Sequence, residues 1–376
     1  MINIKDIPDI KGKRVLLRLD LNVPIENDRV RDSFRIDKAL PTLRYLRSMK
    51  AKVVILAHIE SDRNSLLPVY EYIHGFFNIE FAKNLDDAEV IVKSMKDGEC
   101  LLVENLRNYK GEKDNDEAFS RRLASLGDIY VNDAFSVSHR AHASVVGVPK
   151  FLPHYAGPLL EEEVKNLETA FNPLHPFLFI LGGAKFGTKI PLINRFLNIA
   201  DNVFISGALA NDIYKVKGYE VGRSLISLDS KFDKEIKEII SNNKIIVPED
   251  VVIEDTEKNV TSKPANYLDI GDLINDTGPL SIAKISETVK NYKYVLWNGP
   301  LGNYENGFVD GTANLARALA EATEKSGVKT IVGGGDTLAV IASLGLMDKF
   351  TFLSTGGGAM LDFLANTTLP GIEALK

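Results

Sequence analysis

The 376-residue sequence lacks several features that would place it in a specialised class of protein. Its single cysteine, Cys100, cannot form an internal disulfide, and its place in the apolar run CLLVE predicts a buried small side chain. No apolar run approaches the roughly 20 residues that span a bilayer. The first residues, MINIKDIPDIKGKR, contain no hydrophobic segment of a secretory signal. We therefore expect a cytoplasmic protein with no membrane partner.

An excess of basic residues is also absent. The chain has 45 Lys and Arg against 51 Asp and Glu, which gives a formal net charge of −6. A polyanion-binding protein is usually basic, so we expect no nucleic-acid partner. Neither G-x-x-x-x-G-K-[ST] nor a complete G-x-G-x-x-G occurs, so the two most familiar phosphate-binding loops are missing as well.

Short apolar runs alternate with stretches of helical periodicity along the whole chain. The predicted strands are 14–20, 52–58, 100–104, 128–132, 177–182, 244–248, 294–299 and 329–334, and the predicted helices include 36–49, 115–126, 189–200 and 312–325. Most of the runs are continuously apolar, as in parallel strands that are buried on both faces. This pattern predicts an α/β fold, and the length favours two doubly wound, Rossmann-like domains.

The alternation pauses at EEEVKNLETAFNPLHPF (161–177), where an amphipathic helix is followed by Pro173 and Pro176. We interpret this segment as a hinge helix and linker between an N-terminal domain (1–165) and a C-terminal domain (175–365).

Polar side chains follow the predicted strands of the first half, where ligands collect in open parallel sheets. The candidates are Asp20, Asn22, Arg35, His58, Arg107 and Arg140. An arginine pairs in a bidentate manner with carboxylate or phosphate, so several of them predict a pocket for a small anion.

Glycine-rich turns follow the strands of the second half. They occur in LGGAKFGTKI (181–190), IVGGGDT (331–337) and STGGGA (354–359). Glycines let backbone N–H groups approach phosphate closely, Lys185 and Lys189 add positive charge, and Asp336 provides a carboxylate for Mg²⁺. These turns predict a site for a polyphosphate with its metal.

Taken in order, the motifs resemble the phosphoglycerate kinase family from about residue 14 to the terminal LPGI (369–372). They are RLDLNVP, ENLR, VNDAF with HRAHAS, AGPLL, GGAK with TKI, LWNGPLG, GGGDT and STGGGA. The resemblance implies a magnesium-dependent enzyme, usually a monomer, that transfers a phosphoryl group between ATP and 3-phosphoglycerate in glycolysis or gluconeogenesis. It also implies that the C-terminal tail, 366–376, packs back on the N-terminal domain.

The resemblance assigns roles to individual residues. The six polar candidates of the first half match the substrate-binding positions. In the second half, Lys185 matches the lysine that follows the transferred group, Lys189 the lysine that holds the nucleotide phosphates, and Glu305 the carboxylate on the ribose. The phosphate and metal loop corresponds to Gly334, Gly335, Asp336 and Thr337, and Gly356 to Gly358 would face the group in transfer. Catalysis would rest on Arg35, Lys185, Gly335 and Gly357.

The sequence departs from the family pattern at a few positions. The usual S-H-L-G-R-P reads A-H-I-E-S-D, which leaves Ser61 where an arginine is expected, and we hypothesise that Arg63 replaces it. The helix after STGGGA carries Asp362 in place of a usual Glu, and a usual Glu-Gly-Lys reads 365–367 Ala-Asn-Thr. Glu162 stands where Lys or Ala is common.

Two other interpretations remain. A nicotinamide-dependent dehydrogenase also has two α/β domains, but the missing G-x-G-x-x-G and the many Lys and Arg argue against it. A non-catalytic binding protein would explain the altered residues, but Arg35, Lys185 and Asp336 are present.

Overall fold

The computed structural model describes residues 1–7, 9–227 and 232–376, which form two compact units. Unit 1 contains Met1–Lys165 and Asn366–Lys376, and unit 2 contains Asn166–Ala365. Helix α6 (Pro158–Glu168) runs across the boundary between them. Within the described residues, no helix combines the length and apolarity that crossing a membrane requires.

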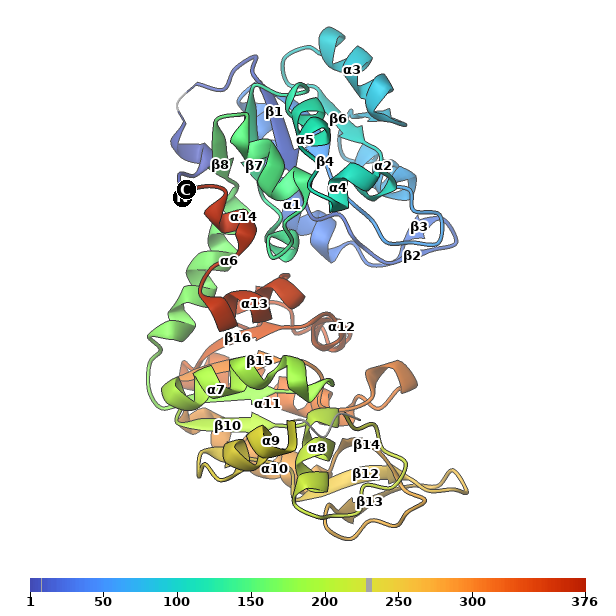
Figure 1. Ribbon diagram of the computed structural model, residues 1–376. Helices are drawn as coiled ribbons and strands as arrows, with labels where there is room; N and C mark the ends of the chain where they lie inside the picture. Colours follow the sequence, from blue (N-terminus) through green and yellow to red (C-terminus); the bar gives the residue numbers. More distant parts are fainter. Residues whose placement is uncertain (8, 228–231) are drawn as a thin grey trace. The chain divides into compact units, whose positions relative to one another are not determined.

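Unit 1 is built on a six-stranded parallel sheet in the order β5-β6-β4-β1-β7-β8 (Figure 1). The strands are β1 (Arg14–Arg18), β4 (Lys52–Leu56), β5 (Glu80–Ala82), β6 (Cys100–Val103), β7 (Ile129–Asn132) and β8 (His154–Ala156). The helices are α1 (Phe34–Ser48), α2 (Leu67–His74), α3 (Leu85–Ser94), α4 (Lys110–Lys113), α5 (Glu117–Ala124) and α14 (Pro370–Glu373). A hairpin of β2 (Ile25–Glu26) and β3 (Arg29–Val30) precedes α1.

The core of unit 1 follows directly from the apolar runs. Helix α1 packs Ile36, Leu40 and Leu43 into the same cluster as Val15 and Leu17 of β1. The spacing of these three helix residues places them on one face, as an amphipathic helix requires. Short 3₁₀ turns η2 (Leu106–Asn108) and η3 (Phe135–Val137) and a π-helical turn η4 (Ala143–Gly147) follow β6 and β7.

The C-terminal segment belongs to unit 1. Figure 1 shows α14, in red, beside the green segment after β7, and the Gly371 backbone N–H donates to the Ser138 carbonyl at 2.7 Å. A side chain at residue 371 would meet Ser138 and Val145 at under 3 Å, so glycine permits this close approach.

Unit 2 contains a second six-stranded parallel sheet, in the order β11-β10-β9-β15-β16-β17. Its strands are β9 (Phe177–Leu181), β10 (Asn202–Ile205), β11 (Ile245–Ile246), β15 (Tyr294–Asn298), β16 (Lys329–Gly333) and β17 (Phe352–Ser354). Its helices are α7 (Ile190–Ile199), α8 (Ala208–Val216), α9 (Asp233–Ile240), α10 (Pro279–Thr288), α11 (Asp310–Ser326), α12 (Gly335–Ser343) and α13 (Gly358–Asn366). The prediction of two doubly wound parallel sheets is therefore confirmed.

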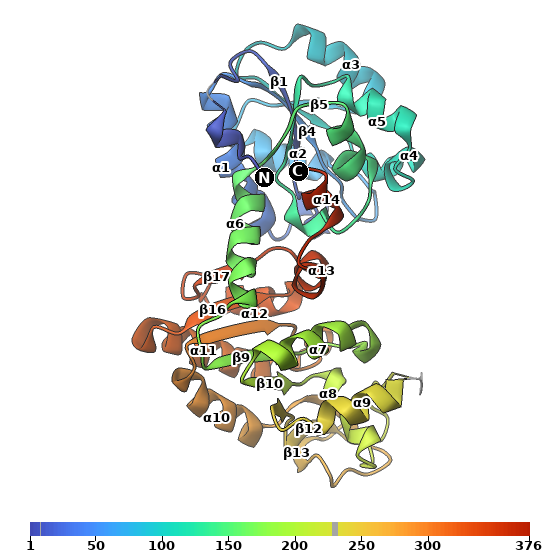
Figure 2. The ribbon, with the colours of Figure 1, turned by 60° about the vertical axis from the view of Figure 1, so that its left-hand side comes forward.

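A three-stranded antiparallel sheet in unit 2 was not predicted. It consists of β12 (Asp250–Glu254), β13 (Val260–Pro264) and β14 (Leu273–Thr277), and Figure 2 shows it beside α8 and α10. The burial along β13 reads exposed at nearly every position, so its sequence carries no apolar alternation that would mark a strand. The inner face of this sheet packs Val251 and Ile253 of β12 against Ala210 and Tyr214 of α8.

Candidate functional site

The two sheets place the predicted residues of each half at the carboxyl ends of the strands. In unit 1, Arg35 lies in the first turn of α1 and donates from Nη1 to Oδ2 of Asp20 at 2.9 Å. The hydroxyl of Ser136 donates to the same oxygen at 2.6 Å, and the N–H of Asn22 donates to Oδ1 at 3.1 Å. Asp20 is buried, so this carboxylate aligns Arg35 rather than facing solvent.

Arg107 and Arg140 are brought together by a residue that sequence reasoning did not single out. Glu60 hydrogen-bonds to Nη1 of Arg107 and lies 3.9 Å from Nη1 of Arg140. The backbone N–H of Glu60 donates to the Asn22 side chain at 2.8 Å. Glu60 lies in the altered stretch A-H-I-E-S-D, directly before Ser61, and its carboxylate is the signal in the sequence for this pairing.

His58 lies behind these arginines, in a buried polar network. Arg18 is fully buried on β1 and places Nη2 at 3.1 Å from Nδ1 of His58. Its Nε donates at 2.9 Å to the hydroxyl of Ser144, which donates at 2.6 Å to Glu112. A charged residue inside the apolar strand RVLLRLD is the sequence signal for this network, because a buried charge needs a partner.

The cluster is strongly electropositive, and its histidines show this. Burial and the neighbouring Arg18, Arg107, Arg140 and His142 hold the pKa of His58 far below its ordinary value. Burial and the same three arginines lower the pKa of His142 to about 4. Both rings are therefore neutral at physiological pH, and the positive field comes from the guanidinium groups, with a contribution from Lys113 at His142.

Arg63 lies elsewhere. Its Nη1 forms an ion pair with Asp28 of the β2–β3 hairpin at 3.0 Å, and its side chain is 75% exposed. This placement gives no support to the hypothesis that Arg63 replaces the missing arginine at Ser61.

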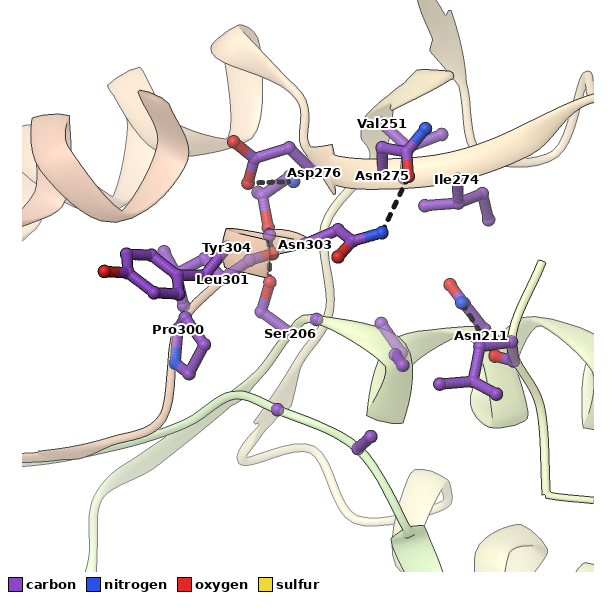
Figure 3. Close-up of a pocket in the computed structure, with 18 of the residues that line it drawn as sticks. Ser206, Asn211, Val251, Ile274, Asn275, Asp276, Pro300, Leu301, Asn303 and Tyr304 are labelled. Atoms are coloured by element: carbon purple, nitrogen blue, oxygen red, sulfur yellow. Dashed lines mark hydrogen bonds between the residues drawn. The ribbon is translucent and has the colours of Figure 1, made fainter. Parts of the chain in front are cut away.

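In unit 2, a pocket of about 350 Å³ opens at the carboxyl ends of β9, β10 and β15 (Figure 3). Gly183, Ala184 and Gly207 line it, together with Glu305 and Asp336. The pocket thus brings together residues predicted for the phosphates, the ribose and the metal. A side chain at residue 183 would meet nothing within 4 Å, so a ligand has open access to this backbone.

The inner part of the pocket combines apolar and amide side chains. Tyr214, Leu225 and Val251 line it with Asn211 and Asn275. Figure 3 shows Asn303 pointing toward Asn275, and the amide of Asn303 donates to Oδ1 of Asn275 at 3.2 Å. The amide nitrogen of Asn211 donates to the Leu225 carbonyl, while its Oδ1 is buried with no partner among the described residues.

The lysines flank this pocket without lining it. Lys185 directly precedes the 3₁₀ turn η7 (Phe186–Thr188). Its backbone has φ 65° and ψ 66°, which is the left-handed region that residues other than glycine seldom adopt. Lys189 follows this turn and is the N-cap residue of α7. Burial lowers the pKa of Lys189, and Asp362 partly offsets the shift.

The glycines of the loops after β16 and β17 are not among the residues that line the pocket. Gly334 and Gly357 have φ of 105° and 53°, and a side chain at Gly335 would meet nothing within 4 Å. Thr337 is fully buried in the first turn of α12, and its hydroxyl has no partner among the described residues.

A metal bound here would find the carboxylate of Asp336, with that of Glu305 lining the same pocket, rather than a cage of ligands. The described residues contain no group of three His, Cys, Asp or Glu side chains suited to a metal ion. Burial and the charge of Glu305 raise the pKa of Asp336. A bound cation would offset the electrostatic repulsion between these two carboxylates. Asp336 and the unpartnered Thr337 hydroxyl fit an ion that takes its other ligands from phosphate and water.

Comparison with known proteins matches the whole chain. A family model described as phosphoglycerate kinase covers residues 4–367. The phosphoglycerate kinase of Wolbachia sp. subsp. Drosophila simulans (strain wRi) is 41% identical over 387 residues, which are 98% of this chain and 97% of the relative. That of Clostridioides difficile (strain 630) is 41% identical over 403 residues, with 100% and 99% covered.

Solved structures agree. The phosphoglycerate kinase of Coxiella burnetii matches with a TM-score of 0.84 and 34% identity, and that of Pyrococcus horikoshii OT3 with 0.88 and 28%. Each match covers 100% of this chain and 98% of the other. A nucleotide-binding fold shared by chance would match one half, whereas these matches run through both units, and the chain therefore belongs to the phosphoglycerate kinase family.

Proposed function

We propose that this protein transfers a phosphoryl group reversibly between ATP and 3-phosphoglycerate, giving ADP and 1,3-bisphosphoglycerate. Unit 1 binds 3-phosphoglycerate, and unit 2 binds the nucleotide. The observation that carries the proposal is the pocket of unit 2, where Gly183, Glu305 and Asp336 line one cavity. Three segments far apart in the sequence supply these residues. The turn at Gly183 suits the phosphates of a magnesium nucleotide, Glu305 suits the ribose, and Asp336 suits the metal.

In unit 1, Arg35, Arg107 and Arg140 bind the carboxylate and phosphate of 3-phosphoglycerate. Asp20 accepts a hydrogen bond from Arg35 and another from Ser136, and it thereby holds Arg35 in position. His58 contributes a hydrogen bond rather than a charge, because its pKa lies far below its ordinary value. Fixed guanidinium forks suit the paired oxygens of carboxylate and phosphate, and they stay charged at every working pH.

In unit 2, the amide and apolar side chains around Asn211 and Tyr214 receive the base, and Glu305 binds the ribose hydroxyls. Lys189 binds the nucleotide phosphates, and the amides after Gly334 and Gly356 approach the terminal phosphate. Asp336, with Thr337 beside it, would hold Mg²⁺, which would neutralise charge on the phosphate oxygens when bound.

The transfer needs positioning and charge neutralisation more than covalent help. The substrate carboxylate is already a nucleophile, so no general base is required to form the acyl phosphate. Lys185, Arg35 and the amides of Gly335 and Gly357 stabilise the charge that develops on the transferred group.

Because each ligand binds its own unit, the transfer also requires the units to approach when both ligands are bound. We propose that α6 is the hinge helix and that the protein acts as a cytoplasmic monomer on small molecules. Solution scattering tests the closure: compaction with 3-phosphoglycerate and a non-hydrolysable Mg-nucleotide together, and little with either alone, is expected. Equal compaction with one ligand would exclude this mechanism.

A coupled assay of ADP formation tests the function itself. ADP should form only when ATP, Mg²⁺ and 3-phosphoglycerate are all present, and Lys185→Ala should nearly abolish it. Lys217→Ala, which removes an exposed lysine at the end of α8, is the matched control and should keep full activity. Nucleotide binding without ADP formation would leave a binding protein and overturn the proposal.

A further inference from the structure

The carboxylate of Glu60 pairs with two arginines of unit 1, Arg107 and Arg140. It hydrogen-bonds to Nη1 of Arg107 and lies 3.9 Å from Nη1 of Arg140. Both arginines are among the residues expected to bind the anionic groups of the substrate. A carboxylate in this place occupies Nη1 of Arg107, a donor that a bound anion would use, and it pairs electrostatically with Arg140.

The two partners of the ion pair differ in how firmly they are held. The side chain of Arg107 is only 10% exposed, and its Nη2 is buried without a partner among the described residues. The side chain of Glu60 is 58% exposed. The arginine is therefore a fixed part of the site, whereas the carboxylate can turn outward into water at little cost.

The backbone of Glu60 is anchored independently of its carboxylate. Its N–H donates to Oδ1 of Asn22 at 2.8 Å. A rotation of the side chain leaves this hydrogen bond intact, so an incoming anion can displace the carboxylate without rearranging the loop after β4. The unpartnered Nη2 of Arg107 offers a further donor that Glu60 does not use.

We propose that Glu60 is an internal competitor of the substrate, which sets the affinity of this site for anions. In the free protein its carboxylate stands in for the anion on Arg107 and Arg140, and every anion must displace it to bind there. The inference rests on the proposed function, because it concerns the same binding site. It adds a residue that lowers affinity, so that small anions leave the site free while a substrate with more contacts still binds.

The test is calorimetric titration of the full-length protein with 3-phosphoglycerate, together with competition by inorganic sulfate. Glu60→Gln should tighten the binding of 3-phosphoglycerate by about fivefold, since a partly exposed ion pair contributes up to about 1 kcal/mol. The inhibition constant of sulfate should fall by the same factor, because both anions displace the same carboxylate. Glu60→Ala should act in the same direction.

Asp62→Asn is the matched control. It removes the same charge from the same loop, but Asp62 is exposed and forms no ion pair with an arginine in the part of the chain that the structure describes. Its binding constants should equal those of the wild type. An equal gain in this variant would mean that general charge, not displacement, controls the affinity.

The other outcomes separate the two proposals. Weaker binding of 3-phosphoglycerate by Glu60→Gln would show that Glu60 orients Arg107 for the substrate, and it would overturn the competitor role. Unchanged binding, or a gain for 3-phosphoglycerate without one for sulfate, would also overturn it. If the wild-type protein bound no 3-phosphoglycerate and formed no ADP, the proposed function would fail instead.

Discussion

Nη2 of Arg18 lies 3.1 Å from Nδ1 of His58, and both groups are buried. A guanidinium only donates hydrogen bonds, so Nδ1 must accept and the ring proton must reside on Nε2. Burial and the surrounding arginines keep the ring neutral by lowering its pKa. Arg18 thus makes His58 a neutral donor of defined tautomer, and it is a positioning residue rather than a catalytic one.

Replacing Arg18 tests this arrangement. Arg18→Met removes the donor to His58 and to the hydroxyl of Ser144, and it leaves the buried carboxylate of Glu112 without its cation. We expect the free energy of unfolding to fall by about 3 kcal/mol or more. Nitrogen NMR shifts of His58 should show a mixture of tautomers and a higher pKa. A single unchanged tautomer in the variant would contradict the role given to Arg18.

The two lysines of unit 2 should separate in kinetics. If Lys185 binds the phosphoryl group only in the transition state, Lys185→Ala should lower kcat by about 10²- to 10³-fold with little change in the nucleotide KM. Lys189→Ala should mainly raise the nucleotide KM. The reverse pattern in steady-state kinetics would mean that the roles are exchanged.

The left-handed backbone of Lys185 predicts that two inactive variants differ in stability. Because glycine adopts φ 65° without strain, Lys185→Gly should be more stable than Lys185→Ala by about 1 kcal/mol. Both variants lack the ammonium group, so their loss of activity should be equal. Chemical denaturation checks the prediction, and equal stabilities would show that the backbone relaxes in both variants.

Substitution of Gly335 should affect activity without lowering stability. A methyl group there meets nothing within 4 Å, and the residue begins helix α12 without a positive φ. Gly335→Ala should leave the protein as stable or up to about 1 kcal/mol more stable. The nucleotide KM or kcat should nevertheless suffer, because the methyl group would stand where phosphate approaches the amide. Full activity in this variant would remove Gly335 from the site.

Binding of an anion should be linked to protonation of His142. Its pKa is lowered to about 4 by burial, by Arg18, Arg107 and Arg140, and by Lys113, while buried Glu112 lies 3.9 Å away. An anion on the arginines cancels part of this positive field and raises the pKa, so the complex takes up protons. Affinity should therefore increase as the pH falls from about 6.5 toward 4.

Sulfate is the suitable probe because it keeps its double charge over this range. Its affinity should rise a few-fold between pH 6.5 and 5, and in His142→Gln this rise should be smaller. The other charged groups around the site are the same in both proteins, so the difference between them isolates His142. Equal pH profiles would show that the ring remains neutral in the complex.

The sequence by itself determined the parallel sheets and the position of the site along each strand. The continuous apolar runs predicted at 52–58 and 177–182 contain the buried strands β4 (Lys52–Leu56) and β9 (Phe177–Leu181), because both faces of such a strand need cover and this requirement is visible in the residues. The polar residues after these runs necessarily meet at one edge of each sheet. Strand β13 escaped prediction, since its exposed residues carry no such pattern.

Tertiary structure alone decided which of these polar residues contact each other. Glu60, Arg107 and Arg140 follow three different strands, and Arg18, Ser144 and Glu112 meet only because the sheet folds their segments together. The tertiary structure also decided the partner of Arg63, which forms an ion pair with Asp28 of the β2–β3 hairpin and not with the cluster of Glu60, Arg107 and Arg140. Electrostatic contacts depend on distance in space and on burial, and neither quantity is encoded in the spacing of residues along the chain.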